Sequence, residues 1–521
     1  MTGDRPPRSA VRPTWEPATL HPEAAALRSS TPQLLLEAAR RTPDRVLLVD
    51  EERTLTVAET VALVAAAQRR LRGLGVGAGS VVASQLPNTW EAVVLAHAVW
   101  GLGAVLVPVP VGHRGAEVTA LLRAIRVDVY AVPHRHRSTD HPALVTAAAV
   151  TAGVQVPLLV VREPGRPFPD RAADAADLEA TQGLDDVCMV MFTSGTTGVA
   201  KGVLHSHRTL IADAESIARL FAMAGERVFM PSPVAHVTGL VYGVIMPLVM
   251  DGSCVLQATW DPSTAVDLVE RYGCTTCVGA TPFLRGLADT YTERGTSSSL
   301  TSFVCGGADV PAGLVRRATD VLGACVVRAY GLTEMPTVTC GGPDDDEATR
   351  STTDGRLTGS SEARLAGVVD GVGELEVRGP ELCLGYLDPA HTAAAFTDDG
   401  WFRTGDLATL DGDRVTIVGR LKDIVVRGGE NISVREVEDH LLEHPRVDDV
   451  AVVGVADDVL GERACAVVVS SDPPPLADLT AFLLGFDIAK HKLPERLLVV
   501  DELPRTPSGK IQKFKLRDLV E

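Results

Sequence analysis

The sequence predicts an α/β fold that changes character twice along the chain. From about residue 31 to 330, apolar patterns with helical spacing alternate with short apolar strands, which is typical of a parallel sheet covered by helices. After residue 340 the pattern changes to short alternating strands separated by turn residues, and beyond Arg420 a further helix-and-strand unit begins. The 521 residues are too many for one compact core, and a boundary near 420 leaves about a hundred residues for a second domain.

Individual elements follow from apolar spacing and turn chemistry. In the first part of the chain the expected helices are 90–102, 115–124 and 142–152, and the expected strands are 104–109, 127–132 and 157–161. The turn at residues 411–413 separates two alternating stretches and predicts a hairpin. In the last part we expect helices at 434–445 and near 476–485, with strands at 447–456 and 463–470.

Composition and charge narrow the classes of function. Hydrophobic residues make up 45% of the chain and charged residues 22%, as in an ordinary soluble globular protein. The formal net charge of -18 disfavours nucleic acid as a partner, because phosphate binding needs Lys and Arg in clustered excess. Two apolar stretches, 92–112 and 143–161, are interrupted by Gly, Pro or polar residues, so we expect no membrane span. The Pro- and Arg-rich start lacks the apolar core of a secretory signal, and a cytoplasmic protein is expected.

The nine cysteines are scattered along the chain, which fits reduced and mostly buried thiols. Cys274 and Cys277 have the spacing of a metal-binding pair, but no second pair and no nearby His accompanies them. We therefore expect them to be structural residues of a buried strand, with a zinc or redox role as the alternative.

A cluster of small, hydrogen-bonding residues marks the first candidate site. The stretch MFTSGTTGVAKGVLHSH, residues 191–207, gathers Ser, Thr and Gly around one lysine. It is not a Walker loop, because Ala200 stands where the second glycine belongs and a strand follows instead of a helix. A hairpin loop of backbone N–H groups, hydroxyls and one ammonium suits a polyphosphate, and the alternative is a flexible linker. The residues of this loop are Thr193, Ser194, Gly195, Thr196, Thr197, Gly198 and Lys201.

Four further motifs follow this loop in a fixed order. They are YGLTE (330–334), FRTGD (402–406), GRLKDIVVRGGENI (419–432) and PRTPSGKIQK (504–513). With the loop they resemble the adenylate-forming superfamily, which includes acyl-CoA synthetases, aryl acid ligases, peptide-synthetase adenylation domains and firefly-type luciferases. The resemblance spans roughly residues 31–515 and is greatest to stand-alone acyl-CoA synthetases.

The resemblance implies an architecture and a reaction. Residues 1–420 would form a large N-terminal AMP-binding (adenylation) domain of helix-flanked β-sheets plus a small β-barrel subdomain. Residues 421–521 would form a small mobile α+β C-terminal domain. A carboxylate would attack the α-phosphorus of ATP to give an acyl-adenylate and pyrophosphate, and the thiol of CoA would then displace AMP. The expected cofactors are ATP, Mg²⁺ and CoA, and the first step mainly requires two anions to be brought together and their charge neutralised.

The same resemblance assigns roles to single residues. The loop from Thr193 to Lys201 would hold the β- and γ-phosphates, and Tyr330 would stack on adenine. Thr333 would bind the α-phosphate, and Glu334 would hold Mg²⁺ with Thr193. The other nucleotide contacts would come from Gly307, Ala308 and Gly331 near adenine, from Asp406 and Arg420 at the ribose, and from Lys510, which would bridge the carboxylate and the α-phosphate. In the C-terminal domain, Lys422 would be the hinge, and Arg427, Gly428 and Gly429 would line the CoA channel.

The acid pocket is expected to be neutral. Amino-acid-activating members of the superfamily carry an Asp where this chain has Ala235 and His236, so an acid without an α-amino group is expected. Small residues would leave room for a bulky apolar acid of the aryl, alicyclic, polycyclic or medium-chain class. The expected lining residues are His236, Val237, Gly279, Ala280, Gly306, Gly307, Gly331, Met335 and Pro336.

The acceptor of the acyl group has more than one interpretation. No carrier-protein segment follows the lysine motif, which favours a stand-alone CoA ligase acting on a small-molecule carboxylic acid. One alternative is delivery to a separate carrier protein or to a non-thiol nucleophile, and another is a non-catalytic nucleotide-binding relative. The sequence also leaves open whether the protein forms a homodimer.

Overall fold

The structure is a computed structural model, and it describes residues 11–15, 25–164, 168–169, 174–193, 201–307, 310–427, 430–432, 434–457, 459–486, 488–505 and 511–520. Some predicted site residues lie outside the described residues, namely Ser194, Gly195, Thr196, Thr197, Gly198, Ala308, Gly428, Gly429 and Lys510. For Lys422 the backbone is described, and it lies in the short 3₁₀ helix η3 (Leu421–Asp423).

The first sheet has six strands in the order β10–β9–β4–β3–β5–β8. Their bounds are β3 (Val81–Ser84), β4 (Val105–Pro108), β5 (Val129–Pro133), β8 (Leu158–Val161), β9 (Val187–Thr193) and β10 (Lys201–Ser206). Neighbouring strands pair in parallel except for β9 and β10, which form an antiparallel hairpin. The connections include α4 (Trp90–Gly101), α5 (Gly115–Ala124), the ribbon β6 (Arg135–His136) and β7 (Thr139–Asp140), α6 (His141–Ala152) and η1 (Ala175–Asp177).

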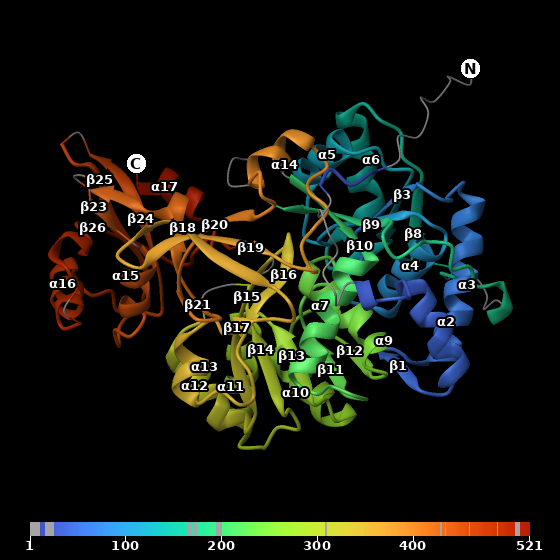
Figure 1. Ribbon diagram of the computed structural model, residues 1–521, viewed down its shortest axis with the longest axis horizontal. Coiled ribbons are helices and arrows are strands. Elements are labelled where there is room, and N and C mark those ends of the chain that lie inside the picture. Colours follow the sequence, from blue (N-terminus) through green and yellow to red (C-terminus); the bar gives the residue numbers. More distant parts are fainter. Residues whose placement is uncertain are drawn as a thin grey trace.

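The second sheet is a thirteen-stranded path that begins parallel and ends antiparallel (Figure 1). Its first part is β2 (Thr54–Thr56), β1 (Val46–Val49), β12 (Ser253–Leu256), β11 (Arg227–Met230), β13 (Thr276–Gly279), β14 (Ser302–Cys305) and β15 (Cys325–Leu332), with β2 antiparallel at the edge. The antiparallel part continues with β16 (Met335–Cys340), β17 (Arg356–Leu357), β21 (Arg414–Arg420), β20 (Phe402–Asp411), β19 (Val372–Arg378) and β18 (Glu362–Val369). The predicted small β subdomain is therefore this antiparallel part, and β15 makes it continuous with the parallel part.

Helices form where an apolar face and a capping residue coincide. α10 (Pro262–Tyr272) shows this, because Asp261 accepts a hydrogen bond from the Thr264 N–H, Pro262 occupies the first turn, and Val266 and Val269 are buried on one face. The other helices of this region are α2 (Thr31–Arg41), α3 (Val57–Gly73), α7 (His207–Leu220), α8 (Val237–Leu240), the π-helix η2 (Val241–Ile245), α9 (Met246–Val249), α11 (Thr281–Arg294), α12 (Ala312–Leu322), α13 (Glu347–Thr352) and α14 (Pro389–Ala395).

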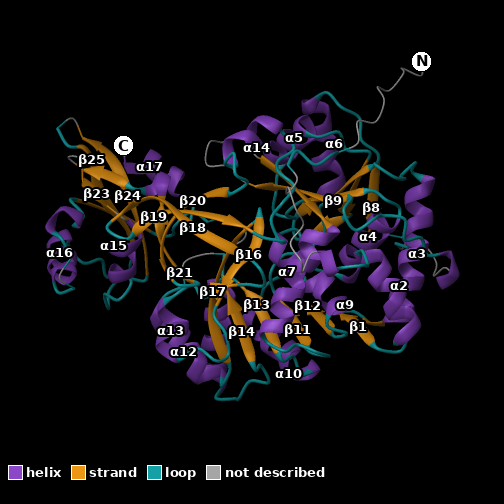
Figure 2. Ribbon diagram, in the orientation of Figure 1, coloured by secondary structure: helices purple, strands orange, loops and turns teal. Residues whose placement is uncertain are grey.

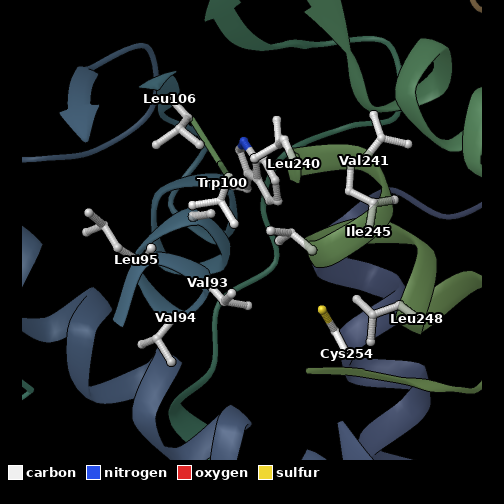
Figure 3. Packing of buried hydrophobic residues seen from close by; sticks show 14 of the residues in the cluster. Val93, Val94, Leu95, Trp100, Leu106, Leu240, Val241, Ile245, Leu248 and Cys254 are labelled. Atoms are coloured by element: carbon white, nitrogen blue, oxygen red, sulfur yellow. The ribbon is translucent and has the colours of Figure 1, made fainter. Parts of the chain in front are cut away.

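The buried side chains define alternating layers of helix and sheet. One core lies between the two sheets, where α3, α4, α7 and η2 pack against residues of both. Figure 3 shows this core, with Trp100 and Leu106 on one side and Leu240 and Ile245 on the other. A second core lies between the second sheet and α10, α11 and α12, and a third lies between the first sheet and α5 and α6. The helices on the faces of both sheets are visible in Figure 2, so both sheets are covered as parallel sheets require.

The last part of the chain has a sheet of its own. Strands β22 (Val425–Arg427), β23 (Glu430–Ile432), β24 (Asp449–Asp457), β25 (Gly461–Val469) and β26 (Arg496–Val500) pair with one another, and α15 (Val434–Leu441), α16 (Leu476–Leu484), η4 (Lys490–Lys492) and α17 (Lys513–Val520) accompany them. This unit lies at one end of the molecule (Figure 1), where α15 contacts β21. The domain boundary at residue 420 stays a prediction, and in the described residues strands on its two sides do not pair.

Most predicted elements agree with the structure to within one or two residues. The hairpin at 411–413 is present, since Asp411 pairs with Arg414. Cys274 and Cys277 are buried free cysteines, and Cys277 lies in β13 as expected. Across the part of the chain that the structure covers, no helix is both long and apolar enough to cross a membrane.

Candidate active site

The ends of the predicted phosphate loop are held together by a hairpin. Lys201 at the start of β10 pairs with Thr193 at the end of β9, and the Thr193 hydroxyl donates to the Lys201 carbonyl at 3.4 Å. The apolar alternation on both sides of the loop forms these strands, so the loop is fixed at both ends as expected. Thr193 and Lys201 are therefore placed side by side, while Ser194 to Gly198 lie outside the described residues.

A segment far along the chain completes the surroundings of Lys201. Residues 384–387 run alongside β10, because the Leu384 N–H donates to the Leu204 carbonyl at 2.8 Å and the Leu387 N–H donates to the Gly202 carbonyl at 2.7 Å. This pairing brings the Tyr386 ring to 5.1 Å from the Lys201 ammonium. Sequence reasoning missed Tyr386, because it stands among apolar residues and has the appearance of a core aromatic.

Thr333 and Glu334 occupy the two-residue turn between β15 and β16. Leu332 pairs with Met335 across the turn, and the register shifts between Tyr330 and Leu332. The Tyr386 hydroxyl donates to the Glu334 carboxylate at 2.5 Å. Glu334 is only 9% exposed, so its carboxylate lies in a largely buried position beside the phosphate-loop hairpin.

His205 holds the backbone of the same turn. Burial lowers the pKa of His205 to about 4, so the ring is neutral at neutral pH. Its Nε2 lies 2.7 Å from the Thr333 carbonyl, which can only accept, so this nitrogen carries the proton. Nδ1 lies 2.9 Å from the Thr209 hydroxyl. Sequence reasoning missed His205, although it stands only four residues after Lys201 in the same stretch of sequence.

Tyr330, Asp406 and Arg420 meet as a group. The Tyr330 hydroxyl donates to one Asp406 oxygen at 2.7 Å, and Arg420 Nε lies 2.7 Å from the other. Asp406 pairs with Arg420 across β20 and β21, and its side chain is almost fully buried. Burial raises the pKa of Tyr330, with the Asp406 charge acting in the same direction. A carboxylate offers about four acceptor positions, so two remain beyond these contacts.

The predicted acid-pocket residues lie where β13, β14 and β15 end. Gly279 ends β13, Gly306 follows β14, and Gly331 lies near the end of β15, and these three strands are neighbours in the sheet. Loops at the carboxyl ends of parallel strands form the usual ligand crevice of α/β folds. Met335 and Pro336 follow on β16, and the remaining predicted lining residues are Val237, Ala280 and Gly307.

His236 is the predicted pocket residue at the N-terminus of α8. It precedes α8, and its Nε2 is buried without a hydrogen-bond partner among the described residues. Burial lowers the pKa of His236 to about 4, and His113 adds to the shift. Asn88 fixes the loop before it, because its side chain donates to the Ser232 carbonyl and accepts from the Val234 N–H, both at 2.8 Å. A neutral, partly buried imidazole suits the wall of an apolar pocket.

A small cavity lies beside the loop that precedes His236. It is lined by Ser84, Leu86, Ala92, Ala96, Leu106, Pro108, Val234, Ala235, Leu240 and Val244. Nine of its ten lining residues have apolar side chains, and Ser84 adds a hydroxyl. Neither α4 nor β4 was predicted to contribute to the acid pocket, because the packing of α4 against η2 is a contact between distant parts of the chain.

The residues present fit a magnesium–nucleotide complex. Among the described residues no group of three or more His, Cys, Asp or Glu side chains could hold a metal ion. Mg²⁺ is usually bound through one or two carboxylates together with substrate phosphates and water. A single buried carboxylate at Glu334, connected to Lys201 through Tyr386, matches that pattern.

The predicted C-terminal residues are placed only in part. Arg427 ends β22, and its Nε lies 2.7 Å from the Glu495 carboxylate, which also pairs with Arg463 at 3.0 Å. Arg427 is therefore held within the C-terminal sheet, where it adjoins the predicted CoA-channel glycines in sequence. The pair Arg505 and Ile511 forms a β-bridge, which brings together the two ends of the segment that contains Lys510.

Comparisons with known proteins identify the family. Residues 35–387 match the AMP-binding enzyme family, and residues 436–510 match the AMP-binding enzyme C-terminal domain. The chain is an AMP-binding enzyme. The medium-chain fatty-acid–CoA ligase of Escherichia coli (strain K12) is 34% identical over 506 residues, which cover 92% of this chain and 88% of that protein.

One further curated relative and one solved structure extend the comparison. The 3-[(3aS,4S,7aS)-7a-methyl-1,5-dioxo-octahydro-1H-inden-4-yl]propanoyl:CoA ligase of Mycobacterium tuberculosis is 34% identical over 504 residues, covering 94% of this chain and 99% of that one. The solved structure of the amide bond synthetase McbA from Marinactinospora thermotolerans has a TM-score of 0.83 at 27% identity, covering 96% of this chain and 100% of that one.

These matches confirm the predicted superfamily and reaction type. The AMP-binding enzyme described here is a ligase that activates a carboxylic acid as an acyl-adenylate, and the two curated relatives are named CoA ligases. The predicted α/β fold, with a large N-terminal part and a smaller C-terminal part, is confirmed as well.

Proposed function

We propose that this enzyme converts a bulky apolar carboxylic acid without an α-amino group, together with ATP and CoA, into acyl-CoA, AMP and pyrophosphate. The observation that carries the acid class is the set of small, uncharged residues at the ends of β13, β14 and β15, together with the neutral His236. Relatives named for a medium-chain fatty acid and for a polycyclic propanoate support the same class. Burial of apolar surface without a charged partner would favour such an acid.

In the first step the enzyme would position two anions and neutralise their charge. The hairpin with Thr193 and Lys201 would bind the β- and γ-phosphates, and Asp406 would accept hydrogen bonds from the ribose. Thr333 would donate to the α-phosphate, and Lys510 would bridge it to the substrate carboxylate. A bound Mg²⁺ at Glu334 would supply positive charge next to the phosphates. The carboxylate oxygen bonds to the α-phosphorus, and the bond to pyrophosphate breaks.

In the second step the sulfur of CoA would bond to the acyl carbon, and the bond to AMP would break. We infer that the unit after residue 420 turns about Lys422, so that Lys510 leaves the site and Arg427, Gly428 and Gly429 approach it. This inference rests on the family's behaviour and on the position of Lys422 between β21 and β22.

The cytoplasmic location and a homodimer remain sequence-based predictions.

A second candidate differs only in the acceptor. McbA is named an amide bond synthetase, so a chain of this fold can direct its acyl group to an amine. Delivery to a separate carrier protein is the other form of this alternative. The uncharged acid pocket is compatible with each of these acceptors, so the acceptor has to be measured.

Pyrophosphate release across a panel of aryl, alicyclic, polycyclic and medium-chain acids tests the proposal. Each acid is assayed with CoA, without CoA and with an amine, and the products are identified by mass spectrometry. An acyl-CoA product for one apolar class supports the proposal and names the class. An amide in place of the thioester, or activity confined to amino acids, would overturn it.

A further inference from the structure

Tyr386 is a buried aromatic residue that reaches the candidate active site from outside the predicted motifs. Its backbone forms a β-bridge with Val203, and the Gly385 carbonyl accepts from the Leu204 N–H at 3.0 Å. Residues 384–387 thus extend the hairpin β9–β10 on the open side of β10. The Tyr386 side chain is 3% exposed, so its position is set by the surrounding structure.

The two ends of the Tyr386 side chain contact two different groups of the site. The ring lies 5.1 Å from the Lys201 ammonium, within the distance at which an aromatic face attracts a cation. The hydroxyl donates to the Glu334 carboxylate at 2.5 Å. One rigid side chain therefore connects the base of the phosphate loop with the turn between β15 and β16.

A short N-terminal segment covers the other side of residues 384–387. The Thr14 hydroxyl donates to the Tyr386 carbonyl at 2.6 Å, and the Thr14 and Trp15 N–H groups donate to the Leu384 carbonyl at 3.0 and 3.1 Å. The Trp15 ring stacks on Phe396 with 4.6 Å between the ring centres. A Cβ at Gly385 would lie 2.3 Å from the Thr14 hydroxyl, so a larger residue there would have to displace the Thr14 side chain.

We propose that Tyr386 is a positioning residue that sets the separation of Lys201 and Glu334, and that Thr14 and Trp15 hold it in place. The inference rests on the proposed function, in which Lys201 binds the β- and γ-phosphates and Glu334 holds Mg²⁺. Both groups must reach different parts of the same triphosphate, so their separation determines whether both contacts form together. AMP lacks the β- and γ-phosphates and is insensitive to that separation.

Two substitutions of Tyr386 separate its two contacts. Tyr386→Phe keeps the ring and loses the hydroxyl, and Tyr386→Leu loses both. Isothermal titration calorimetry measures the Kd of ATP with Mg²⁺, of ATP with EDTA and of AMP. Tyr386→Phe is expected to weaken Mg²⁺–ATP about tenfold, the scale of one hydrogen bond to a charged group, and to leave the other two constants within about twofold. Tyr386→Leu should in addition weaken metal-free ATP by about threefold to tenfold.

Two further variants make the test specific. Val415→Ala shortens another fully buried side chain of the same apolar cluster and is the control for a loss of packing. It should lower the unfolding temperature and leave the ratio of the AMP and ATP constants unchanged. Thr14→Val should also weaken the binding of Mg²⁺–ATP, by a smaller factor than Tyr386→Phe does.

The outcomes separate this inference from the proposed function. If the wild-type enzyme binds Mg²⁺–ATP and Tyr386→Phe binds it equally well, the inference about Tyr386 is overturned and the proposed function is not. The inference also fails if both Tyr386 variants weaken AMP as much as ATP. An unaltered Thr14→Val variant overturns the part assigned to the N-terminal segment. Failure of the wild-type enzyme to bind ATP overturns the proposed function, and this inference with it.

Discussion

Replacing Gly331 by Ala is expected to disable adenylation while most of the fold survives. A Cβ at Gly331 would lie 1.9 Å from the Pro336 carbonyl oxygen and 3.1 Å from the Thr337 Cα. Side-chain carbons essentially never approach other atoms closer than 3.0 Å, so β15 and β16 would have to move apart by at least about 1 Å. These strands carry the Thr333–Glu334 turn between them, and the turn would move with them.

The size of the effect follows from that displacement. A misplacement of about 1 Å at a reacting centre can lower the rate about a hundredfold, and overpacking costs about 1–3 kcal/mol of stability. ATP–pyrophosphate exchange measures the first effect, and thermal unfolding measures the second. We expect exchange to fall by about two orders of magnitude, with a moderately lower unfolding temperature.

Gly313→Ala is the matched control. Gly313 lies in α12, and nothing stands within 4 Å of the position that its Cβ would occupy. In a helix this change is expected to stabilise by about 0.5–1 kcal/mol, and exchange should remain at the wild-type rate. Wild-type exchange in Gly331→Ala would refute the reasoning, since the close approach would then not determine where the turn lies.

Three other perturbations test separate parts of the site and the core. Asp406→Asn should raise KM for ATP about tenfold or more, because the interaction with Arg420 and the proposed ribose contact both lose a charge. Initial-rate measurements test this, and a fall in kcat with an unchanged KM would contradict the ribose role. Burial raises the pKa of Asp213 to about 8, so its contribution to stability is complete below its unfolded value near 3.8 and is lost as pH rises through about 8. Thermal unfolding of Asp213→Asn should therefore show the variant gaining about 1.4 kcal/mol per pH unit relative to wild type between pH 5 and 8, and a constant difference would contradict this. Lys510→Ala should lower the rate of adenylation by about a hundredfold and leave thioester formation from supplied acyl-adenylate unchanged. The control is Lys513→Ala, which removes the ion pair of Lys513 with Glu438 and should leave both half-reactions unchanged.

Local structure could be predicted from the sequence because it depends on neighbouring residues. The helix expected at 115–124 spans Gly115–Ala124, and the strand expected at 157–161 spans Leu158–Val161. The hairpin after Asp411 could be placed for the same reason, since its turn residues are adjacent. Periodicity and turn chemistry act over a few residues, and these elements need nothing more.

Contacts between distant segments could not be predicted in the same way. The motifs identified Tyr330 and Asp406 separately, but not the hydrogen bond between them, which joins residues 76 positions apart. Tyr386 was missed because its role depends on contacts with Lys201 and Glu334, and strand pairing brings these residues together. Thr14 is 372 residues away from the Tyr386 carbonyl to which it donates. Nothing in the local sequence of either segment records such a partner.

The pairing of β1 with β12 has a consequence for synthesis of the chain. Leu48 lies opposite Cys254 in that pair, so β1 has no sheet to join until the ribosome has made about two hundred more residues. At typical rates of 5–20 residues per second this takes about 10–40 seconds. Meanwhile the short strand β2 is the only sheet neighbour of Leu47, Leu48 and Val49, which are buried in the finished enzyme. The nascent chain therefore passes through a long interval in which this apolar strand is open to chaperones or to association with other chains.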